Sequence, residues 1–240
     1  MSASGRNRFF FAMAVVLLAI VLVGFGRTLY LRAFFDVPTI PPRAYVHGII
    51  LTAWFALFCC QAALVAAGRP GLHRRLGILS ALVAVAVIVA NLSVLAGIAP
   101  RLRGVLEDGR LDAAFIVRVI WGDFTSTVVF AAFVSLALLF RHRGEVHRRL
   151  MFLASTSIIG PALGRIALWP AFKEIHNLSF IVSVAPLVFF LGALVIYDLV
   201  RTKRIHPATL TGGAVRILVW LGTGAIAASD FGTRFVLRLA

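Results

Sequence analysis

The residues with the clearest chemical potential are two histidines that occur in the same short string. The string His-Arg-Arg-Leu occurs at residues 73–76 and again at residues 147–150, each time directly before a long apolar run. Ligation of a metal or a haem iron needs a neutral imidazole. A helix start followed by two arginines favours the neutral form, so His73 and His147 are candidate ligands.

The same string is also typical of a topological anchor. Two arginines follow each histidine where the chain is expected to leave the membrane, namely Arg74 and Arg75, then Arg148 and Arg149. Arginines at this boundary bind anionic lipid headgroups, with about 1 kcal/mol for each charge. We therefore predict that these four residues anchor the protein, and the sequence alone leaves anchor and ligand site as alternatives.

A third histidine lies on a polar stripe of its own. His47, Trp54 and Gln61 recur every seven residues, which places them on one helix face over about 21 Å. We predict His47, His73 and His147 as cofactor-binding residues, with haem b as the cofactor. A second ligand beside His47 would have to be His176.

Four further polar residues lie inside apolar windows and share a similar expected depth. They are Asn91, Arg118, Asp123 and Arg165. Polar groups in hydrocarbon cost several kcal/mol without partners, so these side chains should face the interior of a bundle. The cluster is either a buried ion pair that fixes helix packing or a polar pocket for a small anion, a quinone carbonyl or a haem propionate.

The elements that must position these residues are membrane helices. The chain has 240 residues, of which 61% are hydrophobic and 14% charged, against about a quarter charged in soluble globules. Six mostly apolar windows are each long enough to cross about 30 Å of hydrocarbon. They are 9–26, 46–68, 76–98, 113–140, 150–169 and 178–200. A seventh window, 212–229, is shorter and contains Arg216, so it fits a span or an interfacial segment.

We therefore predict an all-α integral membrane bundle of seven or six helices that forms a single domain over residues 1–240. The 24 Lys and Arg residues exceed the 9 Asp and Glu residues, but they lie in short loops rather than on one soluble face. This distribution predicts no nucleic-acid partner. It favours a cytoplasmic N-terminus in a bacterial plasma membrane. The first window is longer than the apolar part of a usual secretory signal, which predicts a retained helix.

An internal repeat and helix breakers complete the expected organisation. The repeated string aligns the second and third helices with the fourth and fifth, so two duplicated hairpins are a hypothesis. Gly160, Pro161 and Pro186 can break helices within spans, as transporters often do at their binding sites. Cys59 and Cys60 are adjacent on one helix, which predicts neither a disulfide nor a metal site.

The order of these strings resembles a group of bacterial multi-pass membrane proteins of uncharacterised function. The resemblance runs from about residue 25 onward: His47-Gly48, residues 73–77, residues 147–151 with Arg165 downstream, and Asp198 with Arg204, His206 and Pro207. More loosely, the helix starts are similar to those of predicted families near b-type cytochromes and oxidase assembly factors. This resemblance implies architecture and a respiratory-chain partner, and it transfers no residue roles.

Three functions follow as hypotheses. The first is a non-enzymatic accessory or scaffold protein anchored in the lipid bilayer. The second is an electron-transfer protein that binds a b-type haem or a quinone through His47, His73 and His147. The third is a small-solute transporter with its site between Arg118, Asp123 and Arg165. The sequence contains no phosphate loop, metalloprotease string or nucleophile elbow, so no hydrolase or kinase is predicted.

Overall fold

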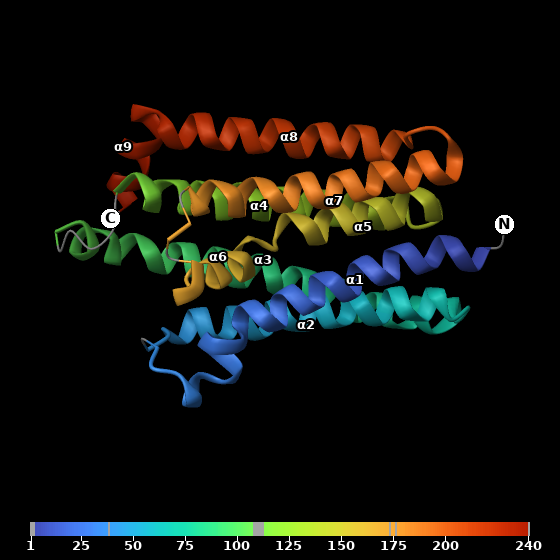
Figure 1. Cartoon of the computed structure of the whole chain (residues 1–240), viewed down its shortest axis with the longest axis horizontal. Helices are drawn as coiled ribbons and strands as arrows, with labels where there is room; N and C mark the ends of the chain where they lie inside the picture. The colour runs from blue at the N-terminus through green and yellow to red at the C-terminus, as the bar shows by residue number, and fades with distance from the viewer. Residues whose placement is uncertain (1–2, 38, 108–112, 173, 176, 240) are drawn as a thin grey trace.

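Long helices run side by side along the molecule, and the described residues contain no strand (Figure 1). The computed structural model describes residues 3–37, 39–107, 113–172, 174–175 and 177–239. The all-α prediction is confirmed. The helices are α1 (Ala3–Phe25), α2 (Pro42–Ala66), α3 (Pro70–Glu107), α4 (Ala113–Leu139), α5 (Gly144–Ser157), α6 (Gly160–Ala167), α7 (Leu178–Thr202), α8 (Pro207–Ala228) and α9 (Asp230–Leu239), with short turns η1 (Gly26–Tyr30), η2 (Arg32–Phe34) and η3 (Pro170–Phe172).

Seven helical segments in the described part of the chain are long and apolar enough to cross a membrane. They are Arg8–Tyr30, Pro42–Ala66, Pro70–Ile98, Ala114–Leu139, Gly144–Ala167, Phe180–Thr202 and Pro207–Ala228. The last one includes most of the window 212–229, and its start at Pro207 gives it the length that the apolar window lacks. Proline suits the first turn of a helix, because its missing N–H has no partner there.

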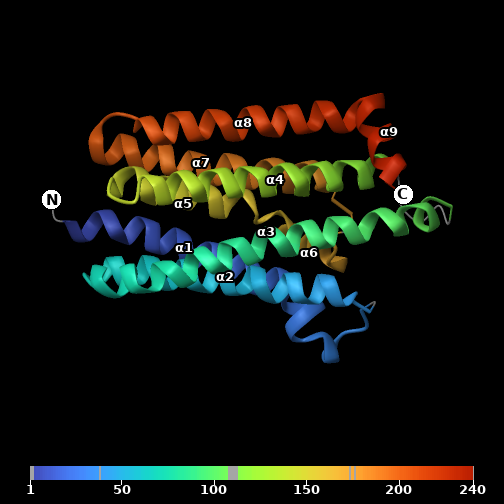
Figure 2. The same ribbon diagram turned by 180° about the vertical axis from the view of Figure 1, so that it is seen from behind.

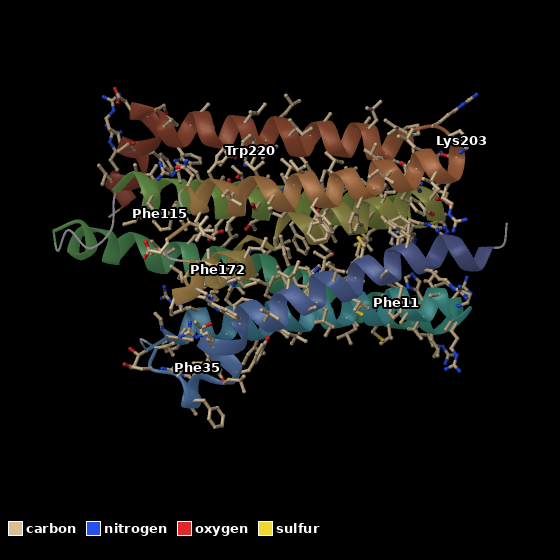
Figure 3. All side chains as sticks on the ribbon, viewed as in Figure 1. Phe11, Phe35, Phe115, Phe172, Lys203 and Trp220 are labelled. Carbon is tan, nitrogen blue, oxygen red and sulfur yellow. The ribbon has the colours of Figure 1, made fainter. Side chains whose placement is uncertain are left out.

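The two chain termini lie at opposite ends of the bundle (Figure 1). We call the end that carries the N-terminus the N-terminal end. The turn between α7 and α8, with Lys203, lies at that end, whereas Phe35 and Phe115 lie toward the other (Figure 3). Because the helices alternate in direction, the first turns of α3 and α5 also lie at the N-terminal end. Both His-Arg-Arg-Leu strings are therefore on one side of the molecule.

Two helical hairpins form the centre of the bundle, as the view from behind shows (Figure 2). Helix α2 packs against α3, α4 packs against α5, and α3 packs against α4. The first hairpin turns at Gly68, whose φ of +70° is in the left-handed region that favours glycine. Helix α1 covers α2 and α6, while α8 covers α4 and α5. This pairing is the arrangement that two duplicated hairpins would require.

The fifth span is broken, whereas the sixth is continuous. Helix α5 ends at Ser157 and α6 begins at Gly160, so Ile158 and Ile159 link two separate helices. Pro161 lies in the first turn of α6, where it cannot continue the hydrogen bonds of α5. Pro186 lies inside α7, which nevertheless runs unbroken from Leu178 to Thr202. Of the two breaks that the sequence suggests, one occurs.

Aromatic side chains fill the middle of the bundle. Trp54 is 2% exposed and packs edge-on against Phe130, with ring centroids 4.9 Å apart. The Trp54 indole Nε1 donates a hydrogen bond to the Ser155 hydroxyl at 3.3 Å. Trp54 lies midway along α2, seven residues from each of the polar residues His47 and Gln61. We call Trp54 and Phe130 the aromatic layer.

Candidate functional site

The two histidines of the repeated string meet across the bundle. Their ring centroids are 6.2 Å apart, and the ring planes are inclined by 82°. His73 lies in the first turn of α3 and His147 in the first turn of α5. The contact joins one helix of each hairpin, so it depends on how the hairpins pack and not on local sequence.

Both imidazoles line one cavity, which we call the histidine cavity. Its volume is about 250 Å³. Most of its wall is apolar or aromatic, with a few polar groups, which is the usual composition of a ligand pocket. The lining residues are Phe10, Trp54, Leu57, Phe58, Gln61, Ala62, Val65, His73, Gly77, Ser80, Leu138, Arg141, Gly144, His147, Arg148 and Met151.

The hydrogen bonds of the two rings differ. Nδ1 of His147 lies 2.8 Å from the backbone carbonyl oxygen of Ala137, to which it can donate only as N–H. This bond fixes the tautomer and leaves Nε2 as the atom with a free lone pair. The His73 ring faces the backbone carbonyl of Gln61, yet its own Nδ1 is buried without a well-formed hydrogen bond.

A polar pair on α2 and α3 lies on the same cavity wall. The Gln61 amide Nε2 donates to the Ser80 hydroxyl at 2.8 Å, and that hydroxyl donates to the Leu76 carbonyl at 3.0 Å. The Gln61 Oε1 atom is buried and has no hydrogen-bond partner. The sequence places Gln61 on the stripe with His47 and Trp54, but its contact with Ser80 depends on how α2 packs against α3.

The spacing of the two rings suits a metal atom held between them. Imidazoles on opposite sides of one metal, each about 2 Å from it, have ring centroids about 6 Å apart. Within the described residues, no group of three or more His, Cys, Asp or Glu side chains forms a metal site. A bare metal ion would therefore have only the two histidines as His, Cys, Asp or Glu ligands here. A metal ion inside a macrocycle is already bound by the nitrogen atoms of that macrocycle.

The four predicted anchor arginines fall into two kinds. Arg74 and Arg75 are exposed. The Arg148 side chain is 24% exposed, lies 3.1 Å from the Glu145 carboxylate and sits over the Phe10 ring. Arg149 is only 1% exposed. The prediction that Arg149 binds headgroups is therefore wrong, because its guanidinium points into the protein.

Arg149 instead forms a buried ionic cluster with Asp198, which the sequence analysis missed. The Asp198 carboxylate is fully buried and accepts hydrogen bonds from Arg149, from the Thr209 hydroxyl at 2.5 Å and from the His206 backbone N–H at 3.0 Å. Glu145 adds a second carboxylate to Arg149 at 2.5 Å. Helices α5, α7 and α8 are thus joined at the N-terminal end by one saturated cluster.

Three of the four predicted intramembrane residues surround a second cavity. Asn91, Asp123 and Arg165 line it together with His47, and its volume is about 80 Å³. We call it the Asp123 cavity. Arg118 is exposed and does not line it. His47 therefore belongs to this cavity and not to the His73–His147 pair, and its suggested partner His176 lies outside the described residues.

The polar groups of the Asp123 cavity are only partly paired. The Asn91 amide Nδ2 donates to the Thr127 hydroxyl at 3.0 Å, but its Oδ1 is buried without a partner. The Arg165 guanidinium donates to the Pro161 carbonyl at 2.9 Å and lies over the Phe25 ring, 4.4 Å from its centroid. This cavity therefore retains hydrogen-bonding capacity.

The fold and these sites define a membrane-spanning helical bundle with two separate cavities, a mostly apolar one at His73 and His147 and a polar one at Asp123. Comparisons with protein-family models, with curated proteins and with solved structures gave no match. The resemblance to the group with repeated His-Arg-Arg-Leu strings stays a prediction. The function therefore has to be argued from the cavities themselves.

Proposed function

We propose that this protein binds one b-type haem in the membrane, and that His73 and His147 would be the residues that hold the iron. The observation that carries the proposal is the 6.2 Å separation of two imidazole centroids on one cavity wall. That separation is the one expected of two axial ligands. The porphyrin would supply the remaining four nitrogen ligands, so no third protein ligand is required.

The hydrogen bond between His147 and Ala137 supports this assignment. Histidines that ligate metals usually donate their second ring N–H to a carbonyl or carboxylate oxygen, which orients the ring and makes the ligating nitrogen more basic. Nδ1 of His147 has such a partner 2.8 Å away.

The residues that line the cavity would contact the two chemical parts of a haem, although the cavity of about 250 Å³ would have to widen to take the whole macrocycle. Phe10, Trp54 and Phe58 offer flat apolar surfaces to a macrocycle, while Arg141 and Arg148 line the same cavity at its polar side. Arginine binds carboxylates strongly, so these two residues are the proposed partners of the propionates. In this arrangement the propionates face the N-terminal end.

The role that follows is one-electron transfer. When bound, a haem with two histidine ligands supplies a reversible iron redox couple without an open coordination position. The protein residues hold the iron, orient the ring and exclude water. This reading favours the electron-transfer hypothesis over the accessory role, and a respiratory-chain membrane protein would be the electron partner. The excess of Lys and Arg in loops at the N-terminal end supports a cytoplasmic location for that end in a bacterial plasma membrane.

The test is a titration of the detergent-purified protein with haemin, followed by visible spectroscopy. We expect the spectrum of a six-coordinate haem in the natural protein, and its loss in His73→Phe and in His147→Phe. His142→Phe is the matched control, since His142 is exposed and close in sequence. His47→Phe should also keep the spectrum, because His47 lines the other cavity. A natural protein without a haem spectrum would overturn the proposal.

A quinone headgroup is a second candidate, and two observations favour it. Gln61 Oε1 and His73 Nδ1 are buried without hydrogen-bond partners. The hydroxyl groups of a reduced quinone can donate to such atoms. The cavity of about 250 Å³ lies just below the usual range of ligand pockets, about 300 to 1,000 Å³, which suits a small ring. Stabilisation by a short-chain quinone, in protein that shows no haem spectrum, would support this candidate.

The scaffold and transporter hypotheses have less support. A scaffold role would stand if neither haemin nor quinone binds. The transporter hypothesis needs Arg118, Asp123 and Arg165 around one solute, and Arg118 is not among the residues that line the Asp123 cavity. Neither hypothesis uses the convergence of His73 and His147.

A further inference from the structure

The Asp123 cavity is not used by the proposed haem site, and its chemistry is different. It lies at His47 on the polar stripe of α2, about 10 Å along the helix from Trp54 and about 21 Å from Gln61, which both line the histidine cavity. Its polar lining consists of His47, Asn91, Asp123, Ser126 and Arg165. Two of these, His47 and Asp123, have side chains that can bind and release a proton.

Among the described residues, the Asn91 side chain supplies an unpaired hydrogen-bond acceptor at this cavity. The Asn91 side chain is 8% exposed, and its Oδ1 lines up with no donor in the protein. A buried carbonyl oxygen without a partner costs about 1 to 3 kcal/mol. The cavity of about 80 Å³ has room for two or three water molecules, each of which occupies about 30 Å³ in the liquid.

The charges on the wall argue against an ionic ligand. An anion would meet the Asp123 carboxylate and the Asn91 carbonyl oxygen, which are both acceptors. A cation would meet the Arg165 guanidinium, whose charge already offsets that of Asp123. Water can donate to the acceptors and accept from Arg165, so it satisfies both kinds of group.

The break between α5 and α6 supports the same conclusion. Ile158, Pro161 and Arg165 line the cavity, so the non-helical link at residues 158–159 lies beside it. Within a membrane, irregular backbone is tolerated where it is buried in protein or lines a water-filled space. The hydroxyls of Thr156 and Ser157 donate to the backbone carbonyls of Leu153 and Ala154, which satisfies the last turn of α5.

We propose that the Asp123 cavity is a hydrated proton-exchange site, in which the Asp123 carboxylate takes up a proton from cavity water and returns it. In the forward step a hydronium ion transfers one proton to the carboxylate and leaves as water, and the reverse step restores the carboxylate. Water would enter from the membrane surface opposite the N-terminal end, because His47 lies within two turns of the start of α2 at that end.

The groups that face Asp123 are few. His47 comes from α2 and Arg165 from α6, while α3 contributes the uncharged Asn91. Helices α5, α8 and α9 also pack against α4, but no residue of these three helices lines the cavity. The charge of Asp123 is therefore balanced mainly by Arg165, and a proton added to Asp123 leaves one net positive charge in the cavity.

Asp198 provides an internal contrast. Its carboxylate is fully buried and saturated by Arg149, Thr209 and the His206 backbone, and it lines neither cavity. Protein donors occupy its acceptor positions, and it faces neither cavity. Among the carboxylates of the described residues that line one of the two cavities, proton exchange is therefore expected at position 123.

The test is an infrared difference spectrum of the purified natural protein, recorded between acidic and alkaline buffer. We expect a C=O band of a protonated carboxyl group that shifts when the protein is transferred to D2O, because water reaches the cavity. The band should be absent in Asp123→Asn and present in Asp230→Asn, which changes an exposed acid. In Asp123→Glu the band should persist at a changed frequency.

Two results would overturn the proposal. One is a spectrum in which the Asp123→Asn variant keeps every carboxyl band of the natural protein. The other is an Asp123 band that does not shift in D2O. Should Asp123→Asn fail to fold, the Glu variant decides the assignment, because an unmoved band cannot belong to residue 123.

Discussion

The two His-Arg-Arg-Leu strings have the same residues but different surroundings. In the first string, at the start of α3, the histidine is half-buried and Arg75 is exposed. In the second string, at the start of α5, the histidine is also half-buried, but the equivalent Arg149 is 1% exposed. The histidines therefore share an environment that the second arginines do not.

The position of each helix explains this difference. Helix α3 begins beside α2, whereas α5 begins among α1, α4, α7 and α8. A charged side chain that is surrounded by helices must find partners, and Arg149 finds Asp198 and Glu145. The histidine of each string lines the histidine cavity. The second arginine differs between the strings, because Arg75 is exposed whereas Arg149 is buried in an ionic cluster.

Among substitutions in the two strings, the largest loss of stability is expected at Arg149. Arg149→Gln should lower the free energy of unfolding by about 3 to 5 kcal/mol, because it leaves the buried Asp198 carboxylate without its cation. Thermal or denaturant unfolding in detergent micelles measures this loss. A loss no larger than that of Arg75→Gln would mean that the two strings are equivalent after all.

Substitution of either histidine should lower the free energy of unfolding by less than Arg149→Gln does, and the two losses should differ. His147→Phe removes the hydrogen bond to the Ala137 carbonyl and should cost about 1 kcal/mol of stability. His73→Phe removes a ring whose Nδ1 has no well-formed bond, so a smaller loss is expected. Both variants should weaken haemin binding more than about 100-fold. If only one of them did so, the shared site between the strings would be refuted.

Acid should destabilise the cluster of the second string through His206. Burial and the positive charge of Arg149 lower the pKa of His206 below its ordinary value. The unfolded chain therefore binds a proton more readily, so stability is complete above about pH 6.5 and falls as the pH decreases below it. The neutral Nδ1 of His206 also accepts the Ala208 N–H at the start of α8, and protonation removes this cap.

Unfolding measured between pH 7.5 and pH 5 tests this dependence. The loss should be under about 1 kcal/mol, since His206 is partly exposed to solvent. His206→Asn keeps a capping side chain without a titrating group, so its stability should vary less with pH. An identical pH profile for both proteins would remove His206 as the source.

The smallest effect is expected at Arg75. Arg75→Gln should change the free energy of unfolding by less than about 0.5 kcal/mol, because the side chain is exposed. The predicted interaction with lipid headgroups should appear as about 1 kcal/mol of extra stabilisation of the natural protein in anionic over neutral nanodiscs. Arg149→Gln should leave that lipid dependence unchanged. Equal lipid dependence in the Arg75→Gln protein would contradict the anchor.

The fold could be predicted from the sequence because apolar length and helix periodicity are local properties. The stripe of His47, Trp54 and Gln61 faces inward, with exposures of 7%, 2% and 8%. The grouping of Asn91, Asp123 and Arg165 followed from their depth in antiparallel helices. Arg118 has a similar depth but lies on an exposed face of α4, which depth alone does not reveal.

The pairing of side chains could not be predicted. Arg149 and Asp198 are 49 residues apart in the chain, and the periodicity of α5 does not specify which neighbour it meets. The approach of His73 to His147 likewise depends on how the two hairpins are packed. Proline at position 161 marked a potential break, but Pro186 carried the same signal in a helix that stays intact.

The aromatic layer has an electrical consequence. Trp54 lines the mostly apolar histidine cavity and lies about 10 Å along α2 from His47, which lines the Asp123 cavity, so the aromatic layer and the apolar cavity wall exclude water from the region on the N-terminal side of the Asp123 cavity. Voltage across a membrane falls mainly where water is excluded. Each elementary charge that crosses this region therefore works against most of the applied voltage, about 2.3 kcal/mol for every 100 mV. The region around Trp54 and Phe130 is therefore where a charge moving between the two ends of the protein would do most of its electrical work.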